Sequence, residues 1–109
     1  MIRIHQSHNI KKSDNNSIIV VIDVLRAFSV TSAALECGVR NIYLLSTPEE
    51  AFSARMDIEQ SVIAGELDGI KVQGFDHGNS PTEIINSKLK GKNLILRTTN
   101  GVMTVSNVI

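Results

Sequence analysis

Apolar residues in this chain fall into short runs separated by segments with helical periodicity. The most apolar run, Ser17–Val24, is continuous and rich in β-branched residues. A continuous run, unlike an alternating one, predicts a strand buried on both faces, as in a parallel sheet covered by helices. Asp23 lies at the carboxyl end of this run, which is where α/β sheets place their ligands.

The rest of the chain repeats the alternation of strand and helix. Strands are predicted over Asn41–Ser46, Ser61–Gly65 and Asn93–Arg97, with a short edge strand over Met1–His5. Helices are predicted over Ala27–Cys37, Thr47–Ile58 and Pro81–Ser87, and the segment Glu66–Asn79 is predicted to be a long irregular connection. This order predicts an α/β fold with a largely parallel sheet flanked by helices and right-handed crossovers.

Two of the predicted helices begin with strong start signals. Thr47-Pro48-Glu49-Glu50 has the pattern of a capping box with proline at the first helical position. The spacing along this helix indicates Phe52 and Met56 as its core contacts. Ser80-Pro81-Thr82-Glu83 repeats the same start pattern. Both helices are therefore predicted to present free N–H groups at their first turns.

Composition narrows the classes of protein. The 109 residues suit a single domain, 1–109, and the 42% hydrophobic content fits a globular protein. Eleven basic against 11 acidic residues give no electrostatic case for nucleic acid or a membrane surface. Apolar runs are too short to span a membrane, and one cysteine, Cys37, is consistent with a reducing cytoplasm. The chain ends on Val108-Ile109 without a C-cap signal, so we expect a truncated chain whose uncovered end frays or self-associates, as in a homo-oligomer.

The segment from Gly74 to Glu83 is the strongest candidate for a ligand-binding element. Its first half contains two glycines, Asp76, His77 and Asn79, directly before the predicted helix start at Ser80. Glycine lets a backbone approach a ligand closely, and a helix N-terminus attracts phosphate or sulfonate. The simpler interpretation is a well-capped junction between loop and helix.

Polar residues also follow each predicted strand. They are Asp23 and Arg26, then Glu66 and Asp68, then Thr98, Thr99 and Asn100. Because parallel strands end at one edge of the sheet, these side chains are expected to converge with those of the 74–83 segment. Carboxylates that hold a divalent cation beside an arginine suit a phosphate ester.

Each of these residues also has a structural interpretation. Asp23 can cap the following helix, Arg26 can be a surface residue, and Glu66 can be a solvated acid. Thr98–Gly101 can be a simple turn. His77 has no second histidine near it, which argues against a transition-metal site, and Cys37 fits a buried small hydrophobe.

The four motifs taken together carry a family resemblance. The ordered segments are Asp23–Thr31 (DVLRAFSVT), Gly65-Glu66, Gly74–Pro81 (GFDHGNSP) and Thr98–Gly101 (TTNG). They resemble the 2-phosphosulfolactate phosphatase family of coenzyme M biosynthesis, over about residues 20–105. His77 and Val102 depart from the family pattern, which bears on the substrate more than on the fold.

The resemblance implies Mg²⁺-dependent hydrolysis of 2-phospho-3-sulfolactate, or a related small phosphate ester, to 3-sulfolactate and phosphate. It also implies a missing C-terminal portion. The residues it suggests are Asp23, Arg26 and Asp76 for catalysis, Asp23, Glu66 and Asp76 for the metal, and Arg26, Asn79, Ser80, Thr99, Asn100 and Gly101 for the phosphorylated, sulfonated acid. The alternative function is a non-catalytic, anion-binding fragment.

Overall fold

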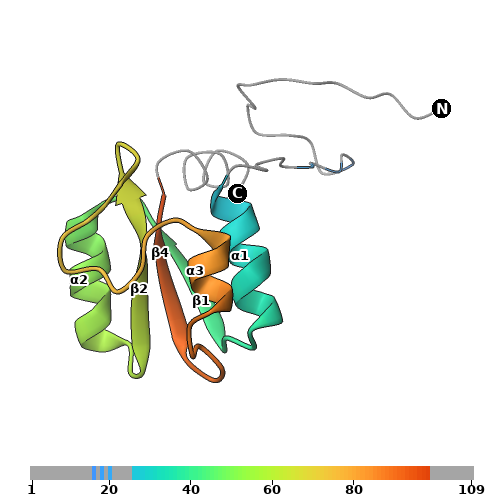
Figure 1. Cartoon of the computed structure of the whole chain (residues 1–109). Coiled ribbons are helices and arrows are strands. Elements are labelled where there is room, and N and C mark those ends of the chain that lie inside the picture. Colours follow the sequence, from blue (N-terminus) through green and yellow to red (C-terminus); the bar gives the residue numbers. More distant parts are fainter. Residues whose placement is uncertain (1–15, 17, 19, 21–25, 99–109) are drawn as a thin grey trace.

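The computed structural model describes residues 16, 18, 20 and 26–98 of the chain. Helices and strands alternate along this part (Figure 1). The helices are α1 (Ala27–Glu36), α2 (Pro48–Asp57) and α3 (Pro81–Ile85), and the strands are β1 (Asn41–Leu45), β2 (Ser61–Leu67), β3 (Ile70–Lys71) and β4 (Asn93–Arg97). The expected strand at Met1–His5 and the expected turn from Thr99 onward lie outside the described residues.

The strands form one mixed sheet in the order β1-β4-β2-β3. β4 is parallel to β1 on one side and to β2 on the other, with Ile95 opposite both Tyr43 and Ile63. All residues of β4 are buried, as a continuous apolar run at the centre of a covered sheet should be. The predicted α/β fold with a largely parallel sheet is therefore confirmed.

Helices cover the sheet on both faces, with α1 and α3 packed together on one and α2 on the other (Figure 1). Alternate residues of each strand point to opposite faces, so Leu94 and Leu96 join the α1–α3 core. Ile63 and Ile95 instead pack with Ala51 and Phe75 on the α2 face. Within the described residues, no helix has the length and apolar character needed to cross a membrane.

The predicted helix starts are confirmed at both positions. Thr47 accepts the Glu50 N–H through its hydroxyl oxygen, and the Glu50 carboxylate accepts the Thr47 N–H, which completes the capping box. Ser80 likewise accepts the Glu83 N–H at 3.4 Å. The carboxylate of Glu83 does not return to Ser80, however, because it binds the preceding loop instead.

The structure corrects the predicted core of α2. Met56 is 87% exposed and Phe52 is 38% exposed, although both were expected in the core. The positions that face the sheet are Ala51, which is fully buried, and the half-buried Ala54. A ten-residue helix on the outer layer buries only one stripe, and Phe52 lies at its margin, with its ring edge-on to Phe75.

Two further expectations fail. Val20, expected inside the first strand, is 71% exposed and belongs to no strand, and Ile18 is likewise exposed. The other residues of the predicted strand Ser17–Val24 lie outside the described part of the chain, so the correction concerns Ile18 and Val20 alone. The connection after Glu66 is also more ordered than expected, because Asp68 and Gly69 adopt positive φ and turn the chain into β3.

Leu96→Ala is expected to lower the free energy of unfolding by about 2–4 kcal/mol, because it leaves a cavity at the sheet centre. Met56→Ala removes a side chain of similar size from the surface of α2 and should change stability by no more than about 0.5 kcal/mol. Urea unfolding followed by circular dichroism measures both. Equal losses for the two variants would contradict the assignment of the core.

Candidate functional site

The carboxyl ends of β1, β2 and β4 lie at one edge of the sheet, because the three strands are parallel. Helices α1 and α3 begin at this same edge (Figure 1). Four of the predicted site residues lie here. Arg26 precedes α1, Glu66 is the next-to-last residue of β2, and Asn79 and Ser80 precede α3. Asp23, Thr99, Asn100 and Gly101 lie outside the described residues.

The 74–80 segment reaches this edge by running alongside β2. Both Asp76 and His77 donate their N–H groups to the Ile63 carbonyl, and Gly65 donates to the His77 carbonyl. Ala64 and His77 form a parallel bridge, so the segment extends the sheet briefly before it leaves for α3. These backbone bonds fix the direction in which the next residues, Gly78 to Ser80, emerge.

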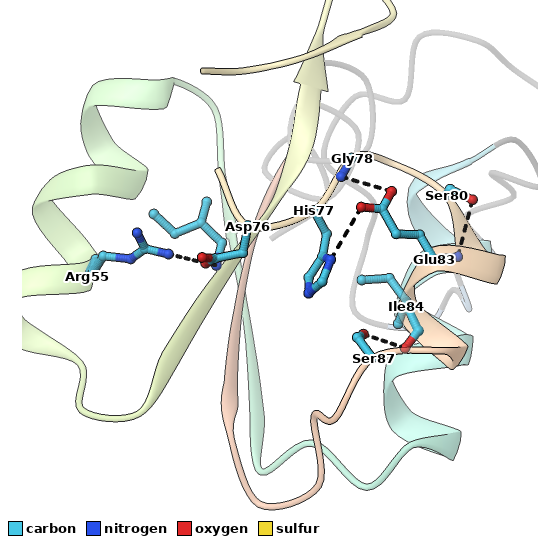
Figure 2. Close-up of polar contacts among 9 residues, drawn as sticks. Arg55, Asp76, His77, Gly78, Ser80, Glu83, Ile84 and Ser87 are labelled. Atoms are coloured by element: carbon cyan, nitrogen blue, oxygen red, sulfur yellow. Dashed lines mark hydrogen bonds and ion pairs between the residues drawn. The ribbon is translucent and has the colours of Figure 1, made fainter. Parts of the chain in front are cut away.

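The structure separates Asp76 from the other predicted site residues. Its Oδ2 atom accepts a hydrogen bond from the Ile63 N–H at 2.8 Å and from the guanidinium of Arg55 on α2 (Figure 2). Asp76 therefore caps an N–H group on the outer edge of β2 and ties the segment to α2. Its described contacts lie with α2 and β2 rather than with Asn79 and Ser80, which favours a structural role.

His77 points the opposite way, towards α3 (Figure 2). Its Nδ1 lies 3.3 Å from Oε1 of Glu83, while Oε2 of Glu83 accepts the Gly78 N–H at 3.2 Å. One carboxylate in the first turn of α3 thus holds two consecutive residues of the loop. The sequence predicted a capping box, in which the Glu83 carboxylate would accept the Ser80 N–H. Its observed partners, Gly78 and His77, lie two and three residues before Ser80.

Among the predicted ligand-binding residues that the structure describes, Asn79 is the most deeply buried. It is 9% exposed, and its Oδ1 atom is the single fully buried side-chain oxygen or nitrogen without a hydrogen-bond partner among the described residues. An unpaired buried amide oxygen costs free energy, so native proteins seldom retain one without a ligand or water to satisfy it. Asn79 therefore carries an acceptor oxygen that no described group satisfies.

Arg26 and Glu66 differ in how free their side chains are. Arg26 is exposed, and its side chain makes no capping bond to α1, although its carbonyl accepts the Val30 N–H. Glu66 is half-buried, and its Oε2 accepts the Gly69 N–H at 2.5 Å in the β2–β3 turn. Arg26 is thus available to an incoming anion, whereas one oxygen of Glu66 is already used.

Sequence reasoning overlooked Arg97, the last residue of β4, although it named the following Thr98. Arg97 is 5% exposed and Thr98 is 4% exposed, both at the carboxyl edge. The Nε group of Arg97 donates to the Ser46 carbonyl at 3.0 Å, and Nη1 donates to the Glu66 carbonyl. The available signal was a charged residue that directly continues the apolar run Leu94–Leu96 into a polar motif.

The described residues contain no group of three or more His, Cys, Asp or Glu side chains able to hold a metal ion. Of the carboxylates predicted as ligands, Asp76 is bound by Arg55 and Glu66 by Gly69, while Asp23 lies outside the described residues. Among the carboxylates in the described residues, only the second oxygen of Glu66 is left for a divalent cation at this edge, and further ligands would come from outside residues 26–98.

A shallow hollow at the opposite, amino edge of the sheet is separate from this site. Cys37 lies in its wall, and its Sγ is 3.7 Å from the Ile84 carbonyl, to which the thiol donates. This bond joins the end of α1 to the end of α3, and Cys37 is half-buried. The interpretation of Cys37 as a small packed side chain is consistent with these contacts.

A family model and individual relatives point to the same family of proteins. The family model described as 2-phosphosulpholactate phosphatase matches residues 4–109. A probable 2-phosphosulfolactate phosphatase of Carboxydothermus hydrogenoformans is 43% identical over 98 residues, which cover 90% of this chain and 40% of that protein. The protein of the same name in Bacillus subtilis is 39% identical over 95 residues, covering 87% of this chain and 40% of the relative. The chain thus spans about 40% of the length of these relatives.

Asp76→Ala is expected to reduce stability by about 1–3 kcal/mol, because it leaves the Ile63 N–H without its acceptor. Arg55→Met removes only the partly exposed ion pair and should cost no more than about 1 kcal/mol. Urea unfolding of both variants gives the comparison. A loss for Arg55→Met as large as that for Asp76→Ala would show that the ion pair, and not the strand-edge bond, holds the segment.

Proposed function

The chain belongs to the 2-phosphosulpholactate phosphatase family, and from this premise we propose that it carries the phosphate-ester site of such an enzyme. The reaction proposed is hydrolysis of 2-phospho-3-sulfolactate, or a related small phosphate ester, to 3-sulfolactate and phosphate. The lone cysteine supports a cytoplasmic location.

The observation that carries this proposal is the buried, unpaired Oδ1 of Asn79 at the carboxyl edge. Hydrolysis requires a water molecule aimed at phosphorus, and an amide oxygen accepts one of its protons and fixes its direction. The loop that carries Asn79 is held on one side by Arg55 through Asp76 and on the other by Glu83. These contacts restrict the movement of the segment, and a group that orients a water molecule needs such a fixed position.

Anionic groups of the substrate are proposed to bind Arg26 and Ser80. The guanidinium of Arg26 presents a fork of N–H donors that matches phosphate or sulfonate oxygens. The Ser80 oxygen accepts the Glu83 N–H, so its own proton remains to be donated to the ligand. Thr99, Asn100 and Gly101, which follow β4 in the sequence, are proposed to bind the same substrate.

Mg²⁺ is proposed as the cofactor, with Asp23 and Glu66 as its protein ligands. When bound, Mg²⁺ would neutralise charge on the phosphoryl oxygens. What supports Glu66 is its position near the carboxyl end of β2 and its second carboxylate oxygen, which the bond to Gly69 does not use. Asp76 is left out of this proposal because its carboxylate binds Ile63 of β2 and Arg55 of α2.

The alternative is an anion-binding fragment without turnover. The observation that favours it is that Asp76 and one oxygen of Glu66 are engaged within the chain, while the exposed Arg26 side chain makes no capping bond. Both functions use Arg26, Asn79 and Ser80 in the same way. They differ only in whether bound ester is hydrolysed.

The first test is release of phosphate from 2-phospho-3-sulfolactate by this chain, with a full-length relative as the positive control. Arg26→Lys keeps the charge but loses the fork, so substrate affinity should fall by about 1–3 kcal/mol with little change in stability. Binding measured by calorimetry without release of phosphate would leave only the anion-binding function. Unchanged affinity in Arg26→Lys would exclude Arg26 from the site.

The second test concerns the metal. Chelation with EDTA should abolish hydrolysis and added Mg²⁺ should restore it, while Glu66→Gln should raise the Mg²⁺ concentration for half-maximal activity by at least about tenfold. Asp68→Asn, a neighbouring exposed acid in the β2–β3 turn, is the matched control and should behave as the unchanged chain does. Hydrolysis that survives EDTA, or equal effects of the two variants, would contradict the assignment.

A further inference from the structure

Arg97 is a buried cation at the centre of the carboxyl edge. It ends the central strand, is 5% exposed, and donates from Nε and Nη1 to the carbonyls of Ser46 and Glu66. These carbonyls follow the apolar parts of the two strands that flank β4. The guanidinium therefore lies across the ends of three parallel strands.

No carboxylate among the described residues neutralises this charge. The ion pairs found there are Arg55 with Asp76 and His77 with Glu83. Glu66, a described acid at the strand ends, accepts from Arg97 through its backbone carbonyl, while its Oε2 accepts the Gly69 N–H. Carbonyl oxygens satisfy N–H donors but carry no net charge, so the positive charge of Arg97 remains uncompensated in this part of the chain.

The backbone around Arg97 is held in place by a close approach. A Cβ atom added to Gly65, its partner in β2, would lie 2.3 Å from the Arg97 carbonyl oxygen and 3.0 Å from the Arg97 Cβ. Gly65 also has φ of +139°, which side chains other than hydrogen rarely allow. The start of the Arg97 side chain is thus fixed between Gly65 and the end of β1.

We propose that Arg97 supplies the fixed positive charge that binds a tetrahedral oxyanion, phosphate or sulfonate, at the carboxyl edge. The inference rests on the proposed function, since it assigns a further residue to the same site. In a poorly solvated setting an ionic attraction is screened little, so Arg97 acts on the anion through charge, with or without direct contact. In this proposal, exposed Arg26 donates paired hydrogen bonds to the anion, and buried Arg97 attracts it electrostatically.

The test uses the 109-residue chain and inorganic phosphate, with sodium methanesulfonate as a second probe and sodium chloride at equal ionic strength as the reference. Thermal unfolding gives the apparent Kd, because a ligand that binds only the folded state raises Tm. Phosphate should stabilise the unchanged chain. Arg97→Gln should weaken phosphate binding at least tenfold, Arg97→Lys should restore most of it, and Arg40→Gln, an exposed arginine at the amino edge, should leave it unchanged.

The comparison of lysine with glutamine separates charge from structure. Arg97 could instead affect phosphate binding only through its hydrogen bonds to the Ser46 and Glu66 carbonyls. Arg97→Lys would then bind phosphate as weakly as Arg97→Gln, and this outcome would overturn the proposal. Unchanged binding in Arg97→Gln, or no stabilisation of the unchanged chain by either anion, would do the same. Arg97→Met serves as a second neutral variant if Arg97→Gln does not fold.

The two probes also identify the bound group. A larger stabilisation by phosphate assigns Arg97 to the reacting ester, and a larger one by methanesulfonate assigns it to the substrate's sulfonate. Anion binding is measured here without turnover. A chain that binds phosphate through Arg97 but releases none from the ester would thus keep this inference while losing the enzymatic function.

Discussion

The parallel pairing of β4 with β1 and β2 is the constraint on which the rest of this structure depends. Each flanking strand must be connected to the next by a crossover, so the helices are forced onto the two faces of the sheet. Because all three strands run in the same direction, their carboxyl ends share one edge with the first turns of α1 and α3. The candidate site follows from that direction, before any particular side chain is considered.

Alternation of side chains along the edge of β2 explains how the functional loop is held. Asp76 and His77 are consecutive, so they point to opposite sides of the sheet, one towards α2 and the other towards α3. Arg55 and Glu83 each hold one of them. The loop is thereby braced from both faces, and Asn79 emerges from it with a buried amide oxygen that no described group satisfies.

At the carboxyl edge, the described acids Glu66 and Asp76 have partners within the chain, whereas the two arginines have no carboxylate partner among the described residues. Two carboxylates that sequence reasoning assigned to metal binding are occupied by internal partners, Asp76 by Arg55 and Glu66 by Gly69. The two arginines are not paired with any carboxylate in the described residues, and they differ in burial. With these described acids engaged internally and its arginines uncompensated, this edge is consistent with the anionic ligand proposed above.

The sequence by itself determined the order and type of the three described helices and of β1, β2 and β4, together with the positions at which α2 and α3 begin, whereas β3 was not predicted. These features depend on local chemistry, namely the apolar run Leu94–Leu96, the Thr47 and Ser80 caps, and Gly38 after the end of α1. The family motifs were equally local. Only the tertiary structure decided which acids are free, that Met56 faces solvent, and that Arg97 is buried. Burial and pairing depend on neighbours distant in sequence, such as Arg55 for Asp76 and Ser46 for Arg97, and no local pattern encodes those distances.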